Sequence, residues 1–304
     1  LLRAMRRSLG LANARICSSS GAILSPEALK FYPALNLPLK SLYGTAEGGL
    51  LAGARSGEIE CETVGSPRPD AELRLGPGSE LIYRQPGTFL GYHSDPAQTA
   101  KALADGWFHS GDAGVVRDDG QLVFFDRVDG LVPLPGGRAF SPQLAESRLR
   151  FSPFIRDAWV FSAGDAAAPP AALIVINAES VGRWAGQRKV AFSSFAELSQ
   201  SPEVYGLIRQ EFDRINRGLP AGARVRRFVN LNREFDPNES ETTRTRNLKR
   251  GVLFERFRSL VEACNTGRTD TEIETRLRHR DGRMETAHAV LTIATIDGAG
   301  EGHG

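Results

Sequence analysis

The stretch SLYGTAEGG, from Ser41 to Gly49, places a lone carboxylate on a loop of glycines and small residues. The residues before it, Pro38 to Leu42, have the pattern of a short strand. In α/β proteins, the loop that follows a parallel strand lies where ligands bind. Because Mg²⁺ prefers one or two carboxylates together with phosphate oxygens, Glu47 is a candidate metal ligand. An exposed turn with a solvated glutamate explains this stretch alone equally well.

The composition is typical of a soluble globular protein. The 304 residues are enough for two domains, and 41% of them are hydrophobic and 24% charged. The net charge of +2 gives no reason to expect nucleic-acid binding. No apolar run is long enough to span a bilayer. The cysteines Cys17, Cys61 and Cys264 form no CxxC pair, so neither a disulfide framework nor a zinc site is expected, and a cytoplasmic location is favoured.

The N-terminal segment LLRAMRRSLG is basic, amphipathic and free of acidic residues. A transit peptide can have this pattern. We favour an internal helix that leads into a strand at Arg15 to Ser19, in which case the chain starts inside a domain.

The pattern of apolar residues changes twice along the chain. Residues 1–60 read as α/β, and residues 61–127 alternate short apolar segments with Gly/Pro turns, which predicts a small antiparallel sheet or barrel. These two parts form a first unit, 1–128. A second α+β unit is expected over 129–265, and a hairpin with a frayed tail over 266–304.

Clear local signals support the second unit and the hairpin. Ser201 and Pro202 begin a helix with one apolar face, which Gly218 ends. PAALIVIN is a strand with a continuous apolar run. In the hairpin, Asp281-Gly282 is the turn signal. Its predicted apolar face consists of Ile273, Thr275, Leu277, Ala287, Ala289, Leu291 and Ile293.

Three further stretches carry candidate binding residues. The small residues SSSGA, from Ser18 to Ala22, end a strand and expose backbone groups, although such residues more often form only a turn. In DGWFHSGDAG, Asp112 can accept hydrogen bonds from two ribose hydroxyls or stabilise a turn. In FFDRVDG, Arg127 can contact a phosphate or ribose, or pair with Asp129 on the surface. His109 is expected to be structural, because no second His or Cys stands at metal-binding spacing.

Taken together, the order and spacing of these motifs resemble the adenylate-forming superfamily, in its long-chain acyl-CoA synthetase branch. SLYGTAEGG is similar to that family's Tyr-Gly-x-Thr-Glu motif, and DGWFHSGD to its Gly-Trp-x-x-Thr-Gly-Asp motif. FFDRVDGLVPLPGGRAFSP resembles its Asp-Arg hinge segment, and SELIYRQPGTFLGYHSDPAQT the segment between. TRTRNLKRGVLFERF resembles the motif that bears the C-terminal lysine. The resemblance covers roughly residues 10 to 260.

The resemblance implies an α/β fold class. The chain would contain the end of a large α/β plus β-barrel adenylate-forming domain, then a small mobile α+β domain and the C-terminal β-hairpin. The implied activity is that of an acid–thiol ligase, as part of a longer enzyme. Such an enzyme uses ATP to convert a long-chain fatty acid to an acyl-adenylate, with Mg²⁺, and transfers the acyl group to CoA with release of AMP. Peripheral membrane contact and oligomerisation stay open.

The resemblance also implies a role for each matching residue. Asp112 would bind the ribose hydroxyls, Arg127 ribose or phosphate, and Glu47 the Mg²⁺. Asp129 would be the hinge of the small domain, and Gly137 would line the CoA tunnel. The implied nucleotide-binding residues are Gly21, Ala22, Tyr43, Gly44, Thr45, Asp112, Phe124 and Arg127, with Tyr43 and Phe124 beside the adenine.

Three departures weaken the match. The family's Gly/Ser/Thr-rich phosphate loop does not occur in these residues. Ala46 stands where the family has Thr, and Asn247 stands where it has the catalytic lysine. Loss of one charge-stabilising donor costs about 3–4 kcal/mol in comparable sites. The alternative is therefore a non-catalytic relative that binds a nucleotide, an acyl chain or a partner subunit. An adenylation domain that loads a carrier protein is a third interpretation.

Overall fold

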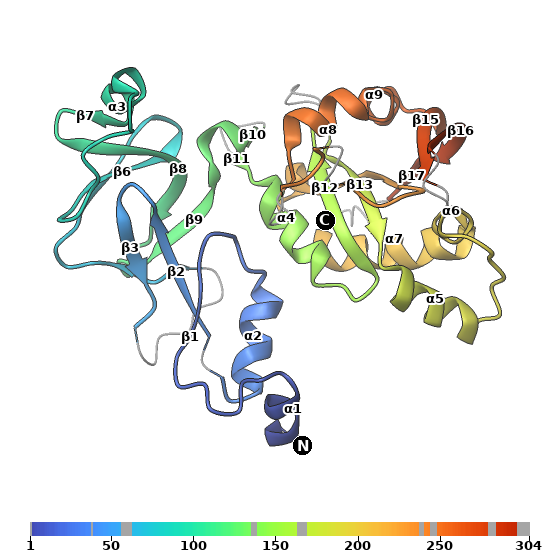
Figure 1. Cartoon of the computed structure of the whole chain (residues 1–304), viewed down its shortest axis with the longest axis horizontal. Helices are drawn as coiled ribbons and strands as arrows, with labels where there is room; N and C mark the ends of the chain where they lie inside the picture. Colours follow the sequence, from blue (N-terminus) through green and yellow to red (C-terminus); the bar gives the residue numbers. More distant parts are fainter. Residues whose placement is uncertain are drawn as a thin grey trace, which may run out of the picture. The chain divides into compact units, whose positions relative to one another are not determined.

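The computed structural model divides the chain into two compact units, Leu1–Leu131 and Val132–Gly304, each described here by itself (Figure 1). It describes residues 2–37, 39–55, 63–134, 139–162, 169–236, 240–243, 248–278 and 284–296. Cys61, Gly137, Asn247, the Asp281-Gly282 turn and the tail lie outside these residues.

The first unit begins with a mixed sheet. Its strands are β1 (Cys17–Ser19), β2 (Leu39–Thr45), β3 (Gly49–Gly53) and β4 (Ser66–Pro67), in the order β1-β2-β3-β4. The β1–β2 pair is parallel and the other pairs are antiparallel. Two helices, α1 (Leu2–Ser8) and α2 (Pro26–Ala34), belong to this part. Ser25 caps the start of α2, because its hydroxyl accepts the Ala28 backbone N–H at 3.1 Å.

A second, antiparallel sheet completes this unit. It contains β5 (Glu72–Leu75), β6 (Glu80–Arg84), β7 (Leu103–Ala104), β8 (Trp107–Val116) and β9 (Leu122–Arg127), with a 3₁₀ turn at Pro77–Ser79 and helix α3 at Pro96–Ala102. The strands run in the order β5-β6-β8-β7, and β9 also pairs with β8. The sequence predicted either a small antiparallel sheet or a barrel, and the described residues form an open sheet.

The core of the first unit is rich in aromatic residues. Tyr83 is fully buried and meets Phe108 edge to face, with ring centroids 5.2 Å apart. Leu81 of β6 and Leu122 of β9, two strands that each pair with β8, are also fully buried. Ile82, between Leu81 and Tyr83, is also buried, so β6 is covered on both faces, as its short apolar segment indicates.

The second unit is built around a sheet with strand order β12-β13-β14-β17. Its strands are β12 (Ile155–Phe161), β13 (Ala171–Ile176), β14 (Arg227–Asn230) and β17 (Ala294–Thr295). The helices are α4 (Pro142–Arg150), α5 (Ala178–Gln187), α6 (Phe195–Gln200), α7 (Pro202–Asn216), α8 (Arg250–Arg256) and α9 (Arg258–Asn265). Shorter elements of this unit are β10 (Val132–Pro133), β11 (Ala139–Phe140) and a 3₁₀ turn at Ala221–Ala223. Another 3₁₀ turn, at Val128–Gly130, is the last element of the first unit.

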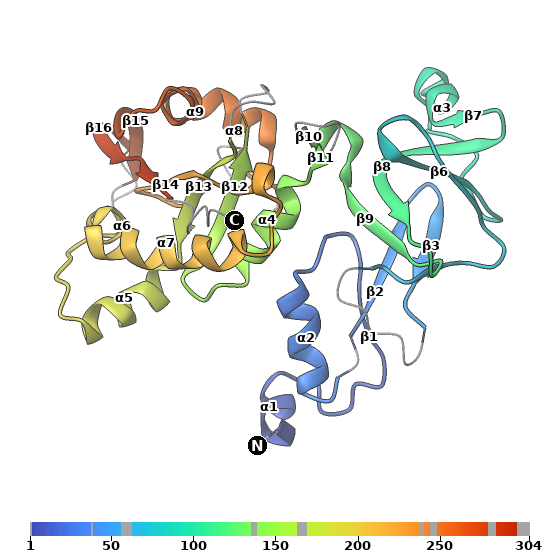
Figure 2. The same cartoon turned by 180° about the vertical axis from the view of Figure 1, so that it is seen from behind.

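Both faces of this sheet are covered (Figures 1 and 2). Val160 and Ile174 pack in one hydrophobic cluster with residues of α4 and α7. Trp159 and Leu173, which alternate with them, pack in a second cluster with residues of α8 and α9. All six residues of β13 are buried, which explains the continuous apolar run in PAALIVIN.

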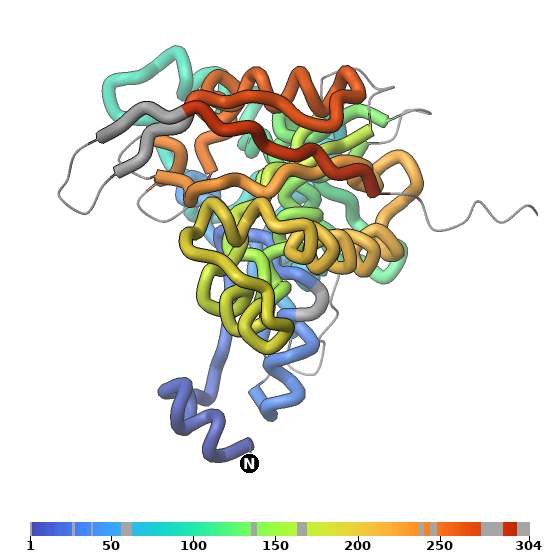
Figure 3. Tube along the Cα trace, turned by 90° about the vertical axis from the view of Figure 1, so that its right-hand side faces the viewer, coloured from blue at the N-terminus to red at the C-terminus, as the bar shows by residue number. Residues whose placement is uncertain are grey.

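The predicted C-terminal hairpin is present as β15 (Asp270–Arg278) and β16 (Met284–Thr292), which pair antiparallel along their length. Ile273 and Leu291 lie on its apolar face and pack in the cluster of α8 and α9. The chain then continues into β17, which pairs with β14, so the hairpin is joined to the central sheet (Figure 3). The Tyr205 hydroxyl donates to the Thr292 carbonyl at 2.7 Å. The hairpin thus contributes to the core of this unit.

We expect the two faces of β16 to respond differently to truncation. Leu291 is fully buried, whereas its neighbour Val290 is 66% exposed. The Leu291→Ala variant should lose about 2–5 kcal/mol of unfolding free energy in urea denaturation, because it leaves a cavity. The matched Val290→Ala variant should stay within about 0.5 kcal/mol of the wild type. Equal losses for the two variants would contradict the packing of the hairpin.

Candidate nucleotide-binding site

Two of the predicted stretches belong to the paired strands β1 and β2 of the mixed sheet. In the parallel β1–β2 pair, Cys17 lies opposite Leu39 and Ser19 opposite Ser41. Gly21 and Ala22 follow the end of β1, and both are exposed. Since the carboxyl ends of parallel strands meet at one edge, these residues leave the sheet beside the end of β2, where α/β sheets bind ligands.

The loop that carries Glu47 is a tight connection between β2 and β3. Thr45 pairs with Gly49 across the two strands, and its hydroxyl accepts the Gly48 backbone N–H at 2.8 Å. The hydroxyls of Thr45 and Tyr83 share a hydrogen bond of 3.1 Å, and burial raises the pKa of Tyr83 to about 12. A Cβ at Gly48 would lie 2.1 Å from the Tyr83 hydroxyl, so glycine is required there. Gly44 is equally constrained, because its Cβ would lie 2.4 Å from the Gly49 carbonyl oxygen.

Glu47 is held at the tip of this loop. Its backbone carbonyl accepts the Phe89 N–H at 2.7 Å, and its Oε1 accepts the Tyr92 hydroxyl at 2.9 Å. Burial and this hydrogen bond raise the pKa of Tyr92. Among the described residues, no three His, Cys, Asp or Glu side chains cluster to hold a metal. A single oriented carboxylate fits Mg²⁺ only where phosphate oxygens and water complete the ligand set.

Asp112 is the centre of the site. It is only 6% exposed and comes from β8. Its Oδ2 accepts the Tyr43 hydroxyl at 2.7 Å, and its Oδ1 accepts Nη1 of Arg127, also at 2.7 Å. The same Arg127 nitrogen donates to the Ser110 carbonyl at 2.7 Å. The tyrosine, the aspartate and the arginine predicted from three separate motifs are therefore in direct contact.

The aromatic residues complete this group. Tyr43 is 7% exposed and stacks on Phe124 with ring centroids 5.3 Å apart. Burial, and then the negative charge of Asp112, raise the pKa of Tyr43 well above its usual range, so its hydroxyl remains a donor. Burial lowers the pKa of Arg127, but the charge and hydrogen bond of Asp112 outweigh this and raise it, so Arg127 remains a cation.

This geometry sets conditions for a ligand. Both oxygens of Asp112 already accept a hydrogen bond, but a carboxylate has about four acceptor positions. Two hydroxyls could use the remaining positions or displace Arg127, whose side chain is 51% exposed. Because Tyr43 is almost fully buried and already stacks on Phe124, a flat ring would meet the partly exposed Phe124 more readily than Tyr43.

The other predicted residues are placed as follows. Asp129 lies in the 3₁₀ turn Val128–Gly130, is exposed, and also raises the pKa of Arg127. The loops of Gly137 and Asn247 are described only at their flanks. Thr242 and Leu248, on either side of the Asn247 loop, form an antiparallel bridge. Sequence reasoning missed Tyr92 and Tyr83 as supports of the loop. Both lie in SELIYRQPGTFLGYHSDPAQT, whose similarity to the family was the available signal.

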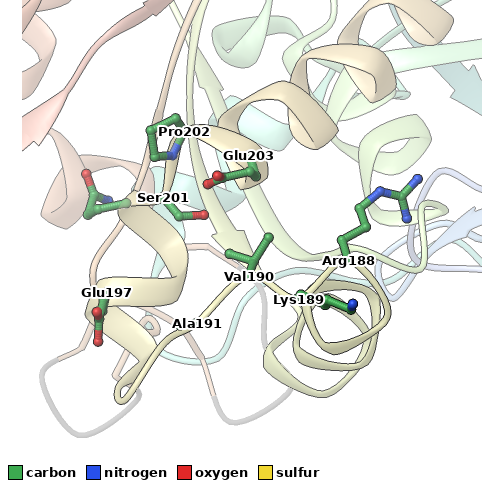
Figure 4. A pocket seen from close by; sticks show the side chains of 9 residues that line it. Arg188, Lys189, Val190, Ala191, Glu197, Ser201, Pro202 and Glu203 are labelled. Carbon is green, nitrogen blue, oxygen red and sulfur yellow. The ribbon is translucent and has the colours of Figure 1, made fainter.

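An open depression lies elsewhere, in the second unit (Figure 4). Arg188 and Lys189 line one side, and Glu203 lies at the start of α7 on the other. None of the predicted nucleotide-binding residues lines it. Separately, no described helix is both long and apolar enough to cross a membrane.

The chain has clear relatives, although no family model matches it. The long-chain-fatty-acid–CoA ligase FadD15 of Mycobacterium bovis is 33% identical over 263 residues, which are 86% of this chain and 43% of that protein. The adenylation domain of a carboxylate reductase from Mycobacterium chelonae matches with a TM-score of 0.66 at 22% identity, over 85% of this chain and 40% of that one. The corresponding domain from Segniliparus rugosus was solved with AMP and a co-purified carboxylic acid. It matches with a TM-score of 0.65 at 18% identity, over 88% of this chain and 44% of that one.

The fold is therefore that of adenylate-forming domains. The identity to FadD15 over most of this chain shows that the chain belongs to the adenylate-forming superfamily. Within that superfamily, it belongs to the long-chain acyl-CoA synthetase branch. This confirms the resemblance seen in the sequence. The chain spans 43% of the length of these relatives.

Removal of the Tyr43 hydroxyl tests the buried contact with Asp112. The Tyr43→Phe variant keeps the stacking on Phe124 but leaves Asp112 Oδ2 without this donor, which should cost about 1–3 kcal/mol in urea unfolding. The control Tyr92→Phe removes a hydroxyl bonded to the less buried Glu47 and should cost about 1 kcal/mol or less. A larger loss for the control would contradict the central role given to the Asp112 contact.

Proposed function

We propose that the protein is an acid–thiol ligase that activates a long-chain fatty acid with ATP and transfers the acyl group to CoA. The observation that carries this proposal is the contact of Tyr43, Asp112 and Arg127, which unites three separate sequence motifs around one buried carboxylate. The similarity to FadD15, whose name states this activity, supports it.

Within this activity, the first unit recognises the nucleotide. Asp112, buried between two donors, accepts the ribose hydroxyls. Arg127 remains cationic, so it can move from Asp112 to a ribose or phosphate oxygen of the substrate. Phe124 packs near the base, and Gly21, Ala22, Gly44 and Thr45 line the pocket at the edge of the β1–β2 pair.

Glu47 is the residue that would hold Mg²⁺, with its carboxylate oriented by the Tyr92 hydroxyl. A bound Mg²⁺ supplies positive charge that offsets the charge of the phosphates. Ala46, beside it, has no hydroxyl to add to this contact.

The remaining residues serve transfer to the thiol. We assign residues 1–128 to the large domain, 129–265 to the small domain and 266–304 to its extension. Asp129 is the hinge about which the small domain rotates between the two half-reactions, and Gly137 lines the CoA tunnel. The proposed location is the cytoplasm, with peripheral contact to the membrane as a further proposal.

A second candidate is a non-catalytic relative that binds nucleotide, acyl chain or a partner. It is favoured by Ala46 and Asn247, which replace a hydroxyl and a cation. The two candidates share the nucleotide site and differ in the rate of adenylation. Binding and rate must therefore be measured separately.

Titration with AMP tests the nucleotide site. The chain should bind AMP, and Asp112→Asn should weaken binding about tenfold or more, because two hydroxyls lose a charged acceptor. The control Asp70→Asn removes an exposed carboxylate paired with Arg68, and should change affinity less than about twofold. Isothermal titration calorimetry gives both values. Unchanged binding by Asp112→Asn would exclude this site.

Restoration of the lysine separates the two candidates. In the natural protein, Asn247→Lys should raise the rate of ATP–pyrophosphate exchange by about a hundredfold, because it restores a cationic donor. Lys249→Ala is measured beside it, because Lys249 lies two residues after Asn247 and could supply the positive charge instead. If Asn247→Lys has no effect and Lys249→Ala abolishes exchange, Lys249 supplies the charge instead. A normal wild-type rate would refute the expected defect.

A further inference from the structure

The turn that presents Asp112 is a bulge in β8. Tyr83 and Ile82 of β6 pair with Phe108 and His109 in regular register, but the next pair joins Glu80 to Ala113. Residues 110–112 therefore lie opposite Leu81 alone. Such bulges locally disrupt the ladder and re-aim side chains, and they are frequent next to active sites.

Side chains replace the ladder hydrogen bonds that the bulge loses. The Ser110 hydroxyl donates to the Leu81 carbonyl at 2.6 Å and accepts the Asp112 N–H at 3.0 Å. Glu80 Oε1 accepts the Gly111 N–H at 2.9 Å, and Glu80 Oε2 lies 3.3 Å from Nδ1 of His109. Glu80 thus bridges His109 and Gly111, the residues on either side of Ser110.

The middle of the bulge requires a glycine and an acceptor for its N–H. Gly111 has a positive φ of 66°, and a Cβ there would lie 2.5 Å from an Arg127 guanidinium nitrogen. The Gly111 N–H is part-buried and needs an acceptor. The Glu80 side chain, 17% exposed, is that acceptor, and a charged acceptor forms one of the stronger hydrogen bonds.

We propose that Glu80 is a positioning residue for ribose recognition. By holding the Gly111 N–H, its carboxylate fixes the bulge that aims Asp112 between Tyr43 and Arg127. Without this acceptor the bulge relaxes, and Asp112 loses its orientation toward the two ribose hydroxyls. The inference rests on the proposed nucleotide site and adds to it a residue that makes no contact with the ligand.

The test compares two ligands that differ only in the hydroxyls, AMP and 2′,3′-dideoxyadenosine monophosphate. The wild-type chain should bind AMP about tenfold more tightly than the dideoxy compound. In Glu80→Ala, AMP affinity should fall about tenfold while dideoxy affinity stays within about twofold, so the preference for ribose disappears. Glu80→Gln keeps a carbonyl that accepts the Gly111 N–H and should retain most of the preference.

The matched control is Glu72→Gln, on the neighbouring strand β5, where the carboxylate pairs with exposed Arg84. It should leave the ratio of the two affinities unchanged. The ratio is insensitive to partial unfolding, because unfolded protein lowers both affinities equally. A folded Glu80→Ala variant that keeps the wild-type ratio, or loses both affinities in parallel, overturns the role of Glu80. Failure of the wild type to distinguish the two ligands overturns the ribose site itself, and the role of Glu80 with it.

Discussion

The carboxylate of Asp112 is buried almost completely, and a buried charge is costly unless donors surround it. The arrangement of the first unit follows from this requirement. Tyr43 at the end of β2 and Arg127 at the end of β9 supply two donors, and the bulge in β8 brings the carboxylate to them. One contact thus joins the mixed sheet to the antiparallel sheet. Glycine is required at 44 and 48 because Gly49 and Tyr83 approach closely there, and at 111 because the backbone has a positive φ.

Buried carboxylates also organise the second unit. Glu146 of α4 accepts the Val160 N–H at 2.9 Å and pairs with Arg250 at 2.8 Å. Arg250, at the start of α8, donates to the Val160 carbonyl at 3.2 Å. Burial raises the pKa of Glu146, and the charge of Arg250 opposes this increase. The pair therefore supplies hydrogen-bond partners for the backbone of Val160 on the edge strand β12. It also links α4 and α8, which cover opposite faces of the sheet. Removal of one partner from such a pair costs about 3–5 kcal/mol.

Much of this was accessible from the sequence because the signals are local. Ser201 caps the helix it was expected to begin, since a hydroxyl before a helix satisfies a free N–H whatever lies around it. The alternation of apolar residues such as Ile273 and Leu291 with polar residues is also a local signal, and it predicted the hairpin. The choice between sheet and barrel after residue 60 was not accessible, because strand pairing depends on residues distant in sequence.

The sequence by itself determined the family and named Tyr43, Asp112, Phe124 and Arg127, because a motif of adjacent residues is visible without a fold. It left Asp112 and Arg127 with alternatives, such as a surface pair of Arg127 with Asp129. Only the tertiary structure decided that Arg127 bonds to Asp112, that Tyr92 orients Glu47, and that Glu80 holds the bulge. These contacts join residues 15 to 45 positions apart, and their geometry follows from strand register and a bulge, which a single chain read in order does not display.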